Sequence, residues 1–151
     1  MHLENFDYKR SHTVYFLTLC TVNKQRYFLN KKMAKVISDE IEFRTSNLKE
    51  ITVFCYCIMP DHLHMLLSLT ENYNQSLQNW VSSFKRYTAK KMNELFGIKP
   101  VWQVNFYEHI VRKEESLRKI ADYVLNNPVR KGIVETWNEY PFSKMVDPLP
   151  I

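Results

Sequence analysis

Hydrophobic residues along this chain fall into strand-like runs and helical spacings, and this pattern predicts its elements. Four stretches dense in β-branched and aromatic residues predict strands at 13–21, 51–58, 62–69 and 106–111. The first is apolar almost throughout, so we expect a central strand buried on both faces. Apolar residues at helical spacing predict helices over about 31–45, from Asn74 or Ser76 to about 95, and over 114–127. The first 11 residues are expected to be irregular, and residues 135–151 to form an extended tail that wraps the domain.

Capping signals mark the ends of these helices. Asn30 has a side chain that can accept hydrogen bonds from the first backbone amides of the helix that follows it. Gly97 ends the second helix, because glycine readily adopts the left-handed conformation found just after helices. The third helix should stop near Asn127, because Pro128 disfavours helical geometry in the residue before it.

The order of these elements defines the fold class. The two middle strands are joined by a short turn at Met59-Pro60-Asp61, which predicts an antiparallel hairpin. Strand, helix, two strands, helix and strand then predict an α+β protein with a ferredoxin-like (βαββαβ) antiparallel sheet and helices on one face. The last helix is additional to that core. We expect one domain over residues 1–151, with the other face of the sheet, or the last helix against it, free for a site.

Composition narrows the classes of function. The chain has 151 residues, of which 45% are hydrophobic and 25% charged, as is typical of globular proteins. Only 2 residues are glycine, so there is no glycine-rich phosphate loop and nucleotide-binding fingerprints are excluded. A formal net charge of +5 favours a polyanionic partner.

The chain contains no recognisable targeting or membrane signal. Residues 1–5 lack the charged and apolar regions of a signal peptide, and no run approaches the ~18 apolar residues of a membrane span. Three cysteines, Cys20, Cys55 and Cys57, form no disulfide framework. These features predict a soluble cytoplasmic protein with reduced thiols and no membrane association.

A pair of histidines at the start of the third strand is the strongest candidate for chemistry. Side chains alternate along a strand, so His62 and His64 project from one face and can supply two ligands to one divalent metal. Two half-exposed histidines with no metal are the alternative. A structural zinc site that adds Cys55 and Cys57, which share one face of the preceding strand, is a further alternative.

The last helix offers a tyrosine and an amide that could join the histidines. Tyr123 and Asn127 are four residues apart, so on one helix the phenol and the amide oxygen would lie one above the other. A tyrosine can act as a covalent nucleophile. The alternatives are a boundary tyrosine in contact with water, or Tyr107 as the nucleophile, because it lies beside His109 in the predicted fourth strand.

Taken together, these segments resemble the HUH single-tyrosine transposases and, more narrowly, the REP-associated tyrosine transposases. The similarity spans about residues 8–134, which we take as the core. It is carried by Tyr15-Phe16-Leu17-Thr18, Asp61-His62-Leu63-His64, Trp102-Gln103, the segment 106–115, and the segment 122–132 on the last helix. The ordered set, rather than the histidine pair alone, makes the resemblance specific.

The resemblance implies a metal-dependent endonuclease and strand transferase that acts on single-stranded DNA with hairpins. By position, His62 and His64 would be metal ligands, with Asn127 where relatives place a polar third ligand. Tyr123 would attack the scissile phosphate and form a 5′-phosphotyrosine, which makes the last helix the catalytic helix. The cofactor would be Mg²⁺ or Mn²⁺. The resemblance leaves open whether the protein is a monomer or a homodimer.

Basic and aromatic side chains are the candidates for DNA contact. Candidate phosphate-binding residues are Lys85, Arg86, Lys90, Lys91, Arg112, Lys113, Arg130 and Lys131. Tyr87, Tyr107 or Trp102 could stack on unpaired bases, whereas Trp80 has the helical spacing of a core residue. A non-catalytic single-stranded nucleic-acid-binding module on the same fold is the alternative function.

Overall fold

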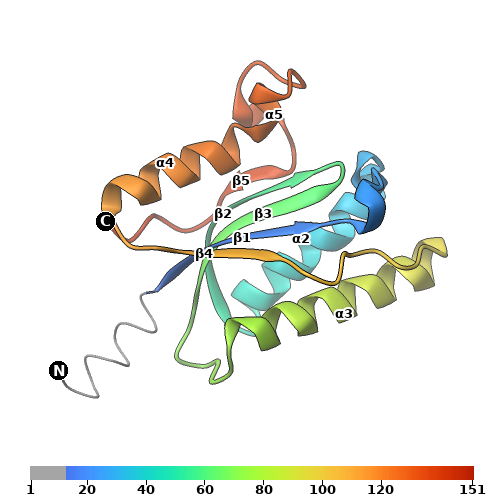
Figure 1. Ribbon diagram of the computed structural model, residues 1–151, viewed down its shortest axis with the longest axis horizontal. Coiled ribbons are helices and arrows are strands. Elements are labelled where there is room, and N and C mark those ends of the chain that lie inside the picture. The colour runs from blue at the N-terminus through green and yellow to red at the C-terminus, as the bar shows by residue number, and fades with distance from the viewer. Residues whose placement is uncertain (1–12) are drawn as a thin grey trace.

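A computed structural model describes residues 13–151 and contains a five-stranded sheet with helices on both faces (Figure 1). The strands are β1 (Val14–Cys20), β2 (Ile51–Met59), β3 (His62–Leu69), β4 (Tyr107–Val111) and β5 (Ser143–Met145). The α-helices are α2 (Lys31–Ser46), α3 (Leu77–Phe96), α4 (Glu114–Leu125) and the short α5 (Asn127–Arg130). Three single-turn 3-10 helices are η1 (Val22–Lys24), η2 (Tyr27–Leu29) and η3 (Trp137–Glu139). The predicted irregular start at residues 1–11 lies outside the described residues.

The sheet has the predicted ferredoxin-like order with one strand added. Its strands are arranged β4-β1-β3-β2-β5, and each neighbouring pair is antiparallel. The first four strands and the helices between them confirm the βαββαβ prediction. The prediction for the C-terminal tail was incomplete, because β5 pairs with the edge strand β2 through Cys55–Cys57. A three-residue strand has too little local pattern to be recognised without its partner.

The two faces of the sheet are covered differently. Helices α2 and α3 pack on one face, where alternate residues of β1, β2 and β3 form the larger apolar cluster. Helix α4 lies across the opposite face (Figure 1), and its buried residues Leu117, Ala121 and Val124 pack against the other set of alternate strand residues. The apolar residues at helical spacing that predicted this helix therefore form its buried side. The single layer of α4 leaves part of its face of the sheet open.

This partial cover corrects the prediction that β1 is buried on both faces. Strand β1 is central, and its residues Leu17 and Leu19 are fully buried under α2 and α3. On the α4 side, Phe16, Thr18 and Cys20 are only partly buried. Apolar runs indicate burial but not which side of a strand lies beneath a helix, so the pattern of this strand alone did not show that its α4 side is partly open.

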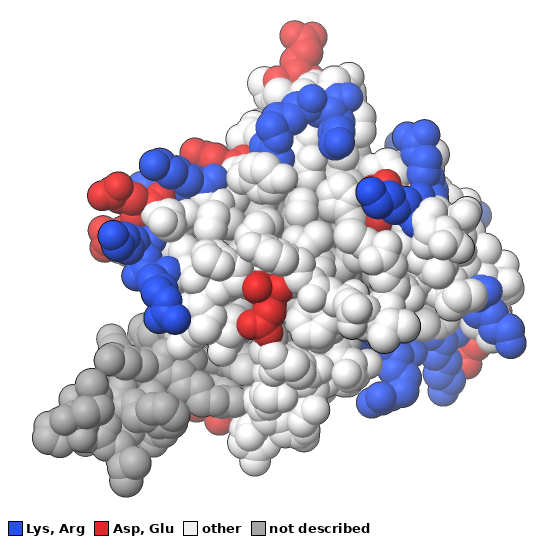
Figure 2. Space-filling view, in the orientation of Figure 1, with Lys and Arg blue, Asp and Glu red and all other residues white. Residues whose placement is uncertain are grey.

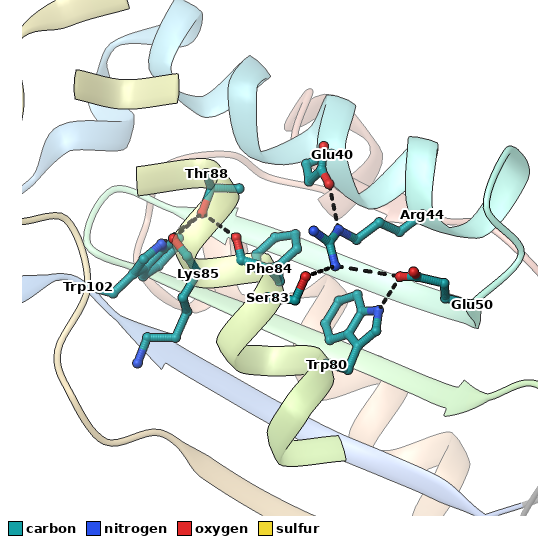
Figure 3. A network of polar contacts seen from close by, with 9 residues as sticks. All are labelled: Glu40, Arg44, Glu50, Trp80, Ser83, Phe84, Lys85, Thr88 and Trp102. Carbon is teal, nitrogen blue, oxygen red and sulfur yellow. Dashed lines mark hydrogen bonds and ion pairs between the residues drawn. The ribbon is translucent and has the colours of Figure 1, made fainter. Parts of the chain in front are cut away.

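A buried polar network joins α2 to α3 on the closed face (Figure 3). The Arg44 guanidinium forms an ion pair with Glu40 within α2, and it also donates to Ser83 on α3 at 3.0 Å. Glu50, just before β2, lies 3.5 Å from Arg44 and accepts a hydrogen bond from the indole of Trp80. Trp80 is fully buried, as its helical spacing predicted. The network therefore links the two helices that cover the closed face of the sheet, opposite the open face beside α4.

Helix capping follows the sequence signals. The Asn30 side chain accepts hydrogen bonds from the backbone amides of Lys32 and Met33 at the start of α2. Gly97 ends α3 in the left-handed conformation, with φ of 68°. Across residues 13–151, no helix combines the length and apolar character needed to cross a bilayer.

Candidate active site

The candidate site lies on the open face of the sheet, where the C-terminal end of α4 meets β1 and β3. His62 and His64 project from β3 on the same side, and their ring centroids are 4.6 Å apart. Strand β1 lies beside β3 with Thr18 paired to His64 and Cys20 paired to His62. The site-facing side chains of both strands therefore come from every second residue, as the pleat requires.

His62 is held between a carboxylate and an amide. Its Nδ1 lies 2.7 Å from Asp61 Oδ1, and a carboxylate at this position accepts the Nδ1 proton. Its Nε2 is then the nitrogen with a free electron pair, and it lies 3.0 Å from Asn127 Nδ2. Asn127 is buried, so its amide is confined beside the His62 ring. A half-turn of the amide about its last torsion exchanges the nitrogen for the oxygen at that place.

His64 is the more deeply buried of the pair, with 7% of its surface exposed. Its Nδ1 lies 2.8 Å from the Thr18 hydroxyl, which leaves Nε2 as the nitrogen available for another partner. Burial, with smaller effects from His62 and Arg130, lowers the pKa of His64 to about 3. The imidazole is therefore neutral at physiological pH, which is the form that binds metals.

These donors fit a divalent metal ion. Each histidine has its Nδ1 engaged by a neighbouring side chain, which leaves Nε2 as the nitrogen that could bind a metal; in His62 this nitrogen contacts the Asn127 amide. With its amide turned by half a turn, Asn127 could add a carboxamide oxygen beside His62 Nε2. Two imidazoles and one amide oxygen leave positions for water or phosphate and suit Mn²⁺ or Mg²⁺.

The alternative zinc site is not supported. Within residues 13–151, no three His, Cys, Asp or Glu side chains are grouped so that they could hold one metal ion. Cys55 and Cys57 are fully buried in the apolar cluster beneath α4, and burial raises the pKa of each thiol to about 12. Both cysteines therefore belong to the core as protonated thiols.

The chain between Tyr123 and Asn127 is not one regular helix. Helix α4 ends at Leu125, and α5 begins at Asn127 with Pro128 in its first turn. Pro128 has no N–H to continue the helical hydrogen bonds, which explains the break. The prediction of one helix carrying both residues was therefore wrong in detail. The break turns Asn127 inward to His62, while Tyr123 remains 47% exposed.

Arg130 spans this break and holds the tyrosine. Its Nη2 donates to the backbone carbonyl of Tyr123 at 2.7 Å, which satisfies an acceptor left free near the end of α4. Its guanidinium also lies over the Tyr123 ring, with Cζ 3.9 Å from the ring centroid. Predicted as a phosphate-binding residue, Arg130 lies within the site itself and contacts the candidate nucleophile from two directions.

Of the two candidate tyrosines, Tyr123 lies nearer to the histidines. Its ring centroid is 5.7 Å from that of His64. Phe16 packs edge-on against both Tyr123 and Tyr107, at 6.2 and 6.0 Å between centroids. Tyr107 is on β4, which β1 separates from the histidine-bearing strand β3. Phe16, on β1, contacts both tyrosine rings.

The predicted DNA-contact residues fall into three separate groups. Lys85, Arg86, Lys90 and Lys91 are on α3, which covers the face of the sheet opposite the site. Arg112 and Lys113 precede α4 at its N-terminal end, whereas Arg130 and Lys131 follow its C-terminal end. Basic side chains are spread around the rim of the molecule in Figure 2, including a group over α5. Of the predicted DNA-contact residues, only Arg130 and Lys131 lie beside the histidines.

Two of the predicted DNA-contact residues are already engaged in hydrogen bonds within the protein. The Lys85 ammonium donates to the backbone carbonyls of Gln103 and Val104 at 2.6 and 3.0 Å, and burial lowers its pKa. Trp102 is buried and its indole donates to Thr88, so it is not placed to stack on a base (Figure 3). Tyr87 and Tyr107 remain exposed.

The residues that orient the histidines were not predicted from the sequence. Thr18 and Asp61 were assigned to a strand, to a turn and to the segments that carry the resemblance, but not to a role beside the histidines, and the stacking of Arg130 on Tyr123 has no sequence signal. The Asp61 contact is between neighbouring residues, so the pattern Asp-His could have suggested it. Thr18 is 46 residues from His64 and is found only when the strands are paired.

Comparison with known proteins identifies relatives over most of the chain. The family described as "Transposase IS200 like" matches residues 10–127. A Haemophilus influenzae protein provisionally named a REP-associated tyrosine transposase is 27% identical over 154 residues, which cover 91% of this chain and 84% of that protein. A REP-associated tyrosine transposase of Escherichia coli K12 is 26% identical over 129 residues, which cover 85% of this chain and 74% of that protein.

A solved structure shares the fold. It is the structure of a REP-associated tyrosine transposase bound to a REP hairpin, and it is 25% identical to this chain. The match has a TM-score of 0.66 and covers 88% of this chain and 76% of that one. The sheet and its covering helices are therefore those of this group of proteins.

Proposed function

Because the chain belongs to the IS200-like transposases, we propose that it cleaves and rejoins single-stranded DNA through a covalent bond to Tyr123. Membership of a transposase family makes the protein an enzyme. The substrate we propose is DNA that folds into hairpins at palindromic repeats. This proposal is supported by the likeness to the REP-associated tyrosine transposases, one of which is known bound to a REP hairpin.

The observation that carries the proposal is the grouping of Tyr123 with the two histidines on one open face. The Tyr123 ring is 5.7 Å from His64, and the His62 and His64 rings are 4.6 Å apart. These side chains come from α4 and β3, which are remote in sequence. A phosphate group next to Nε2 of both imidazoles would lie beside the Tyr123 phenol.

The proposed first step transfers a phosphoryl group from one oxygen to another. The Tyr123 oxygen bonds to phosphorus and loses its proton, while the bond from phosphorus to the 3′-oxygen breaks and that oxygen takes up a proton. The products are a 5′-phosphotyrosine and a strand with a free 3′-OH. Attack by a 3′-OH on the phosphotyrosine reverses the step and joins two strands. Because the ester stores the bond, no nucleotide cofactor is required.

Residues around the nucleophile keep it in place for this step. Arg130 holds the Tyr123 ring and backbone carbonyl, and its positive charge lies where a phosphotyrosine would add negative charge. Asp61 and Thr18 orient the imidazoles, and His62, His64 and Asn127 would hold a divalent metal ion. When bound, the metal would polarise the scissile phosphate and offset its developing charge.

Covalent attachment to DNA tests the proposal directly. End-labelled hairpin oligonucleotides taken from palindromic repeats near the coding region would be incubated with the protein and Mn²⁺, and separated on a denaturing gel. We expect a slowly migrating covalent band that is absent from Tyr123→Phe and from His64→Ala, and absent when a chelator replaces the metal.

Tyr107→Phe is the matched control, because it removes a tyrosine hydroxyl from β4, across β1 from the histidines. It should retain the covalent band. Loss of the band in Tyr107→Phe but not in Tyr123→Phe would assign the nucleophile to β4 instead. Tight binding with no covalent band for any hairpin would favour a non-catalytic nucleic-acid-binding module.

A further inference from the structure

We propose that the outer surface of helices α2 and α3 is a docking groove for a short, acidic amphipathic helix of another protein. This inference concerns the closed face of the sheet and is independent of the DNA chemistry proposed for the open face. It starts from two cavities of about 380 Å³ each between these helices. Because both cavities are lined by Val36, Asp39 and Leu95, they form one continuous groove.

The groove runs lengthwise between the two helices. On α2 it is lined at every third or fourth residue from Lys32 to Phe43, and on α3 at every fourth residue from Tyr87 to Leu95. From residue 32 to residue 43 a helix rises about 16 Å, which is three turns. A third helix of this length has the complementary shape, because helices pack with their side chains in the grooves of their neighbours.

Three large apolar side chains in this groove are exposed to solvent. Phe43, Tyr87 and Leu95 are 45, 42 and 61% exposed, and none of them belongs to either apolar cluster of the sheet. Val36 and Phe96 also line the groove, and they connect it to the core beneath the helices. Single exposed apolar side chains are common on protein surfaces, but several in one groove with polar residues around them are typical of an interaction site.

The charges of the groove favour an acidic partner. Each acidic residue that lines it, Asp39 or Glu40, is already in an ion pair within α2. Among the described residues, Lys32 and Lys91 also line the groove and form no ion pair. The Lys91 ammonium lies 5.8 Å from the centroid of the Tyr87 ring, so a positive charge adjoins the apolar surface. Glutamate or aspartate beside the apolar residues of a docked helix would complement these lysines.

A second copy of this chain fits the groove less well than another protein does. The formal net charge of +5 makes two copies repel each other. Helices α2, α3 and α4 bury their apolar sides against the sheet, so none of the long helices in residues 13–151 is free to dock with such a side. The groove also lies on the face of the sheet opposite the histidines, so a partner bound there would leave the candidate active site open.

A library of displayed peptides tests the proposal. Its members are helical peptides of about 18 residues with Leu or Phe at positions i, i+3, i+4 and i+7, and with Glu, Gln or Lys at the flanking positions. After selection on the full-length protein, we expect the enriched peptides to carry Glu at the flanking positions. Fluorescence anisotropy of single peptides should then show an affinity at least about tenfold lower for Leu95→Glu than for the parent protein. The matched control is Leu29→Glu, because Leu29 is 60% exposed but lies outside the groove on η2, and this variant should bind as the parent does.

A charge reversal tests the acidic character of the partner. In Lys32→Glu/Lys91→Glu, we expect the selected peptides to bind about tenfold more weakly, because like charges then face each other. Versions of the same peptides with Lys in place of Glu should bind this variant more tightly than they bind the parent protein. Arg118→Glu/Lys119→Glu makes the same change in net charge on the exposed side of α4, and it should leave the preference for acidic peptides intact.

Several results would overturn the docking groove. They are the absence of any enriched peptide, enrichment of uncharged or basic peptides, and equal binding of the selected peptides to Leu95→Glu and to the parent protein. A dimer seen by analytical ultracentrifugation and lost in Leu95→Glu would assign the groove to a second copy instead. Weaker binding of single-stranded oligothymidylate by Lys32→Glu/Lys91→Glu, with no peptide selected, would assign it to nucleic acid. None of these results bears on the covalent band, so the proposed function is tested separately.

Discussion

Acid should destabilise the metal-free protein through His64 in particular. The ring is 7% exposed, and burial beside His62 and Arg130 lowers its pKa to about 3 in the folded protein. In the unfolded chain the same histidine titrates at its ordinary pKa of about 6.5. As the pH falls from 6.5 toward 3, the unfolded chain therefore takes up a proton that the folded protein does not, and the free energy of unfolding decreases.

The size of the effect follows from the gap between these two pKa values. Each pH unit of titration by the unfolded chain alone costs about 1.4 kcal/mol. Between neutral pH and pH 4, His64 should therefore remove about 3 kcal/mol from the free energy of unfolding. That is a large share of the 5–15 kcal/mol typical of a whole domain.

Urea unfolding followed by tryptophan fluorescence measures this loss, with chelator present and at several pH values from 7 to 4. His64→Gln removes the titrating ring while keeping a polar side chain of similar length. Its own change in stability is a constant offset, so the difference between the two proteins isolates the titration. We expect that difference to change by about 3 kcal/mol across this range. Parallel pH profiles, or an NMR titration that places the pKa of the His64 ring near 6.5, would refute the reasoning.

Three further changes test the site, the closed face and the packing of α4. Asp61→Asn should weaken Mn²⁺ binding roughly 10- to 100-fold by titration calorimetry with little change in melting temperature, because an amide orients the His62 ring less well. Arg44→Leu should lower the free energy of unfolding by about 3–5 kcal/mol, since Glu40 is left buried without its partner, and adding Glu40→Gln should recover much of that loss. Leu117→Ala should cost about 2–5 kcal/mol in urea unfolding, whereas the control Leu95→Ala, whose side chain is mostly exposed, should change stability by less than about 0.5 kcal/mol.

Local features of the sequence were sufficient for most of the fold. Strand and helix periodicity involve neighbouring residues only, so the strands β1 to β4 and the helices between them follow from the hydrophobic pattern. The same period of two places His62 and His64 on one side of β3 without any knowledge of the partner strands. The Asn30 cap is likewise local, because the side chain bonds to amides two and three residues later.

The environment of the site depended on contacts that the local pattern does not encode. Thr18 meets His64 only because β1 and β3 pair in one particular register, and a shift of one residue would turn it to the other face. Lys85 looked like a free surface charge, yet the connection after α3 passes beneath it and supplies two carbonyls. Register and loop paths are set by packing across the whole domain, so they appear only in three dimensions.

The segment from the end of α4 into α5 shows both levels within a few residues. Pro128 by itself determines that a regular helix cannot continue through this point, because it has no N–H to donate. The direction that each side chain takes after the break was decided by the tertiary structure: Asn127 turns inward to His62, and Arg130 folds back over Tyr123. Sequence determined which groups are available and where regular structure ends, whereas the packing of α4 on the sheet decided which of those groups meet.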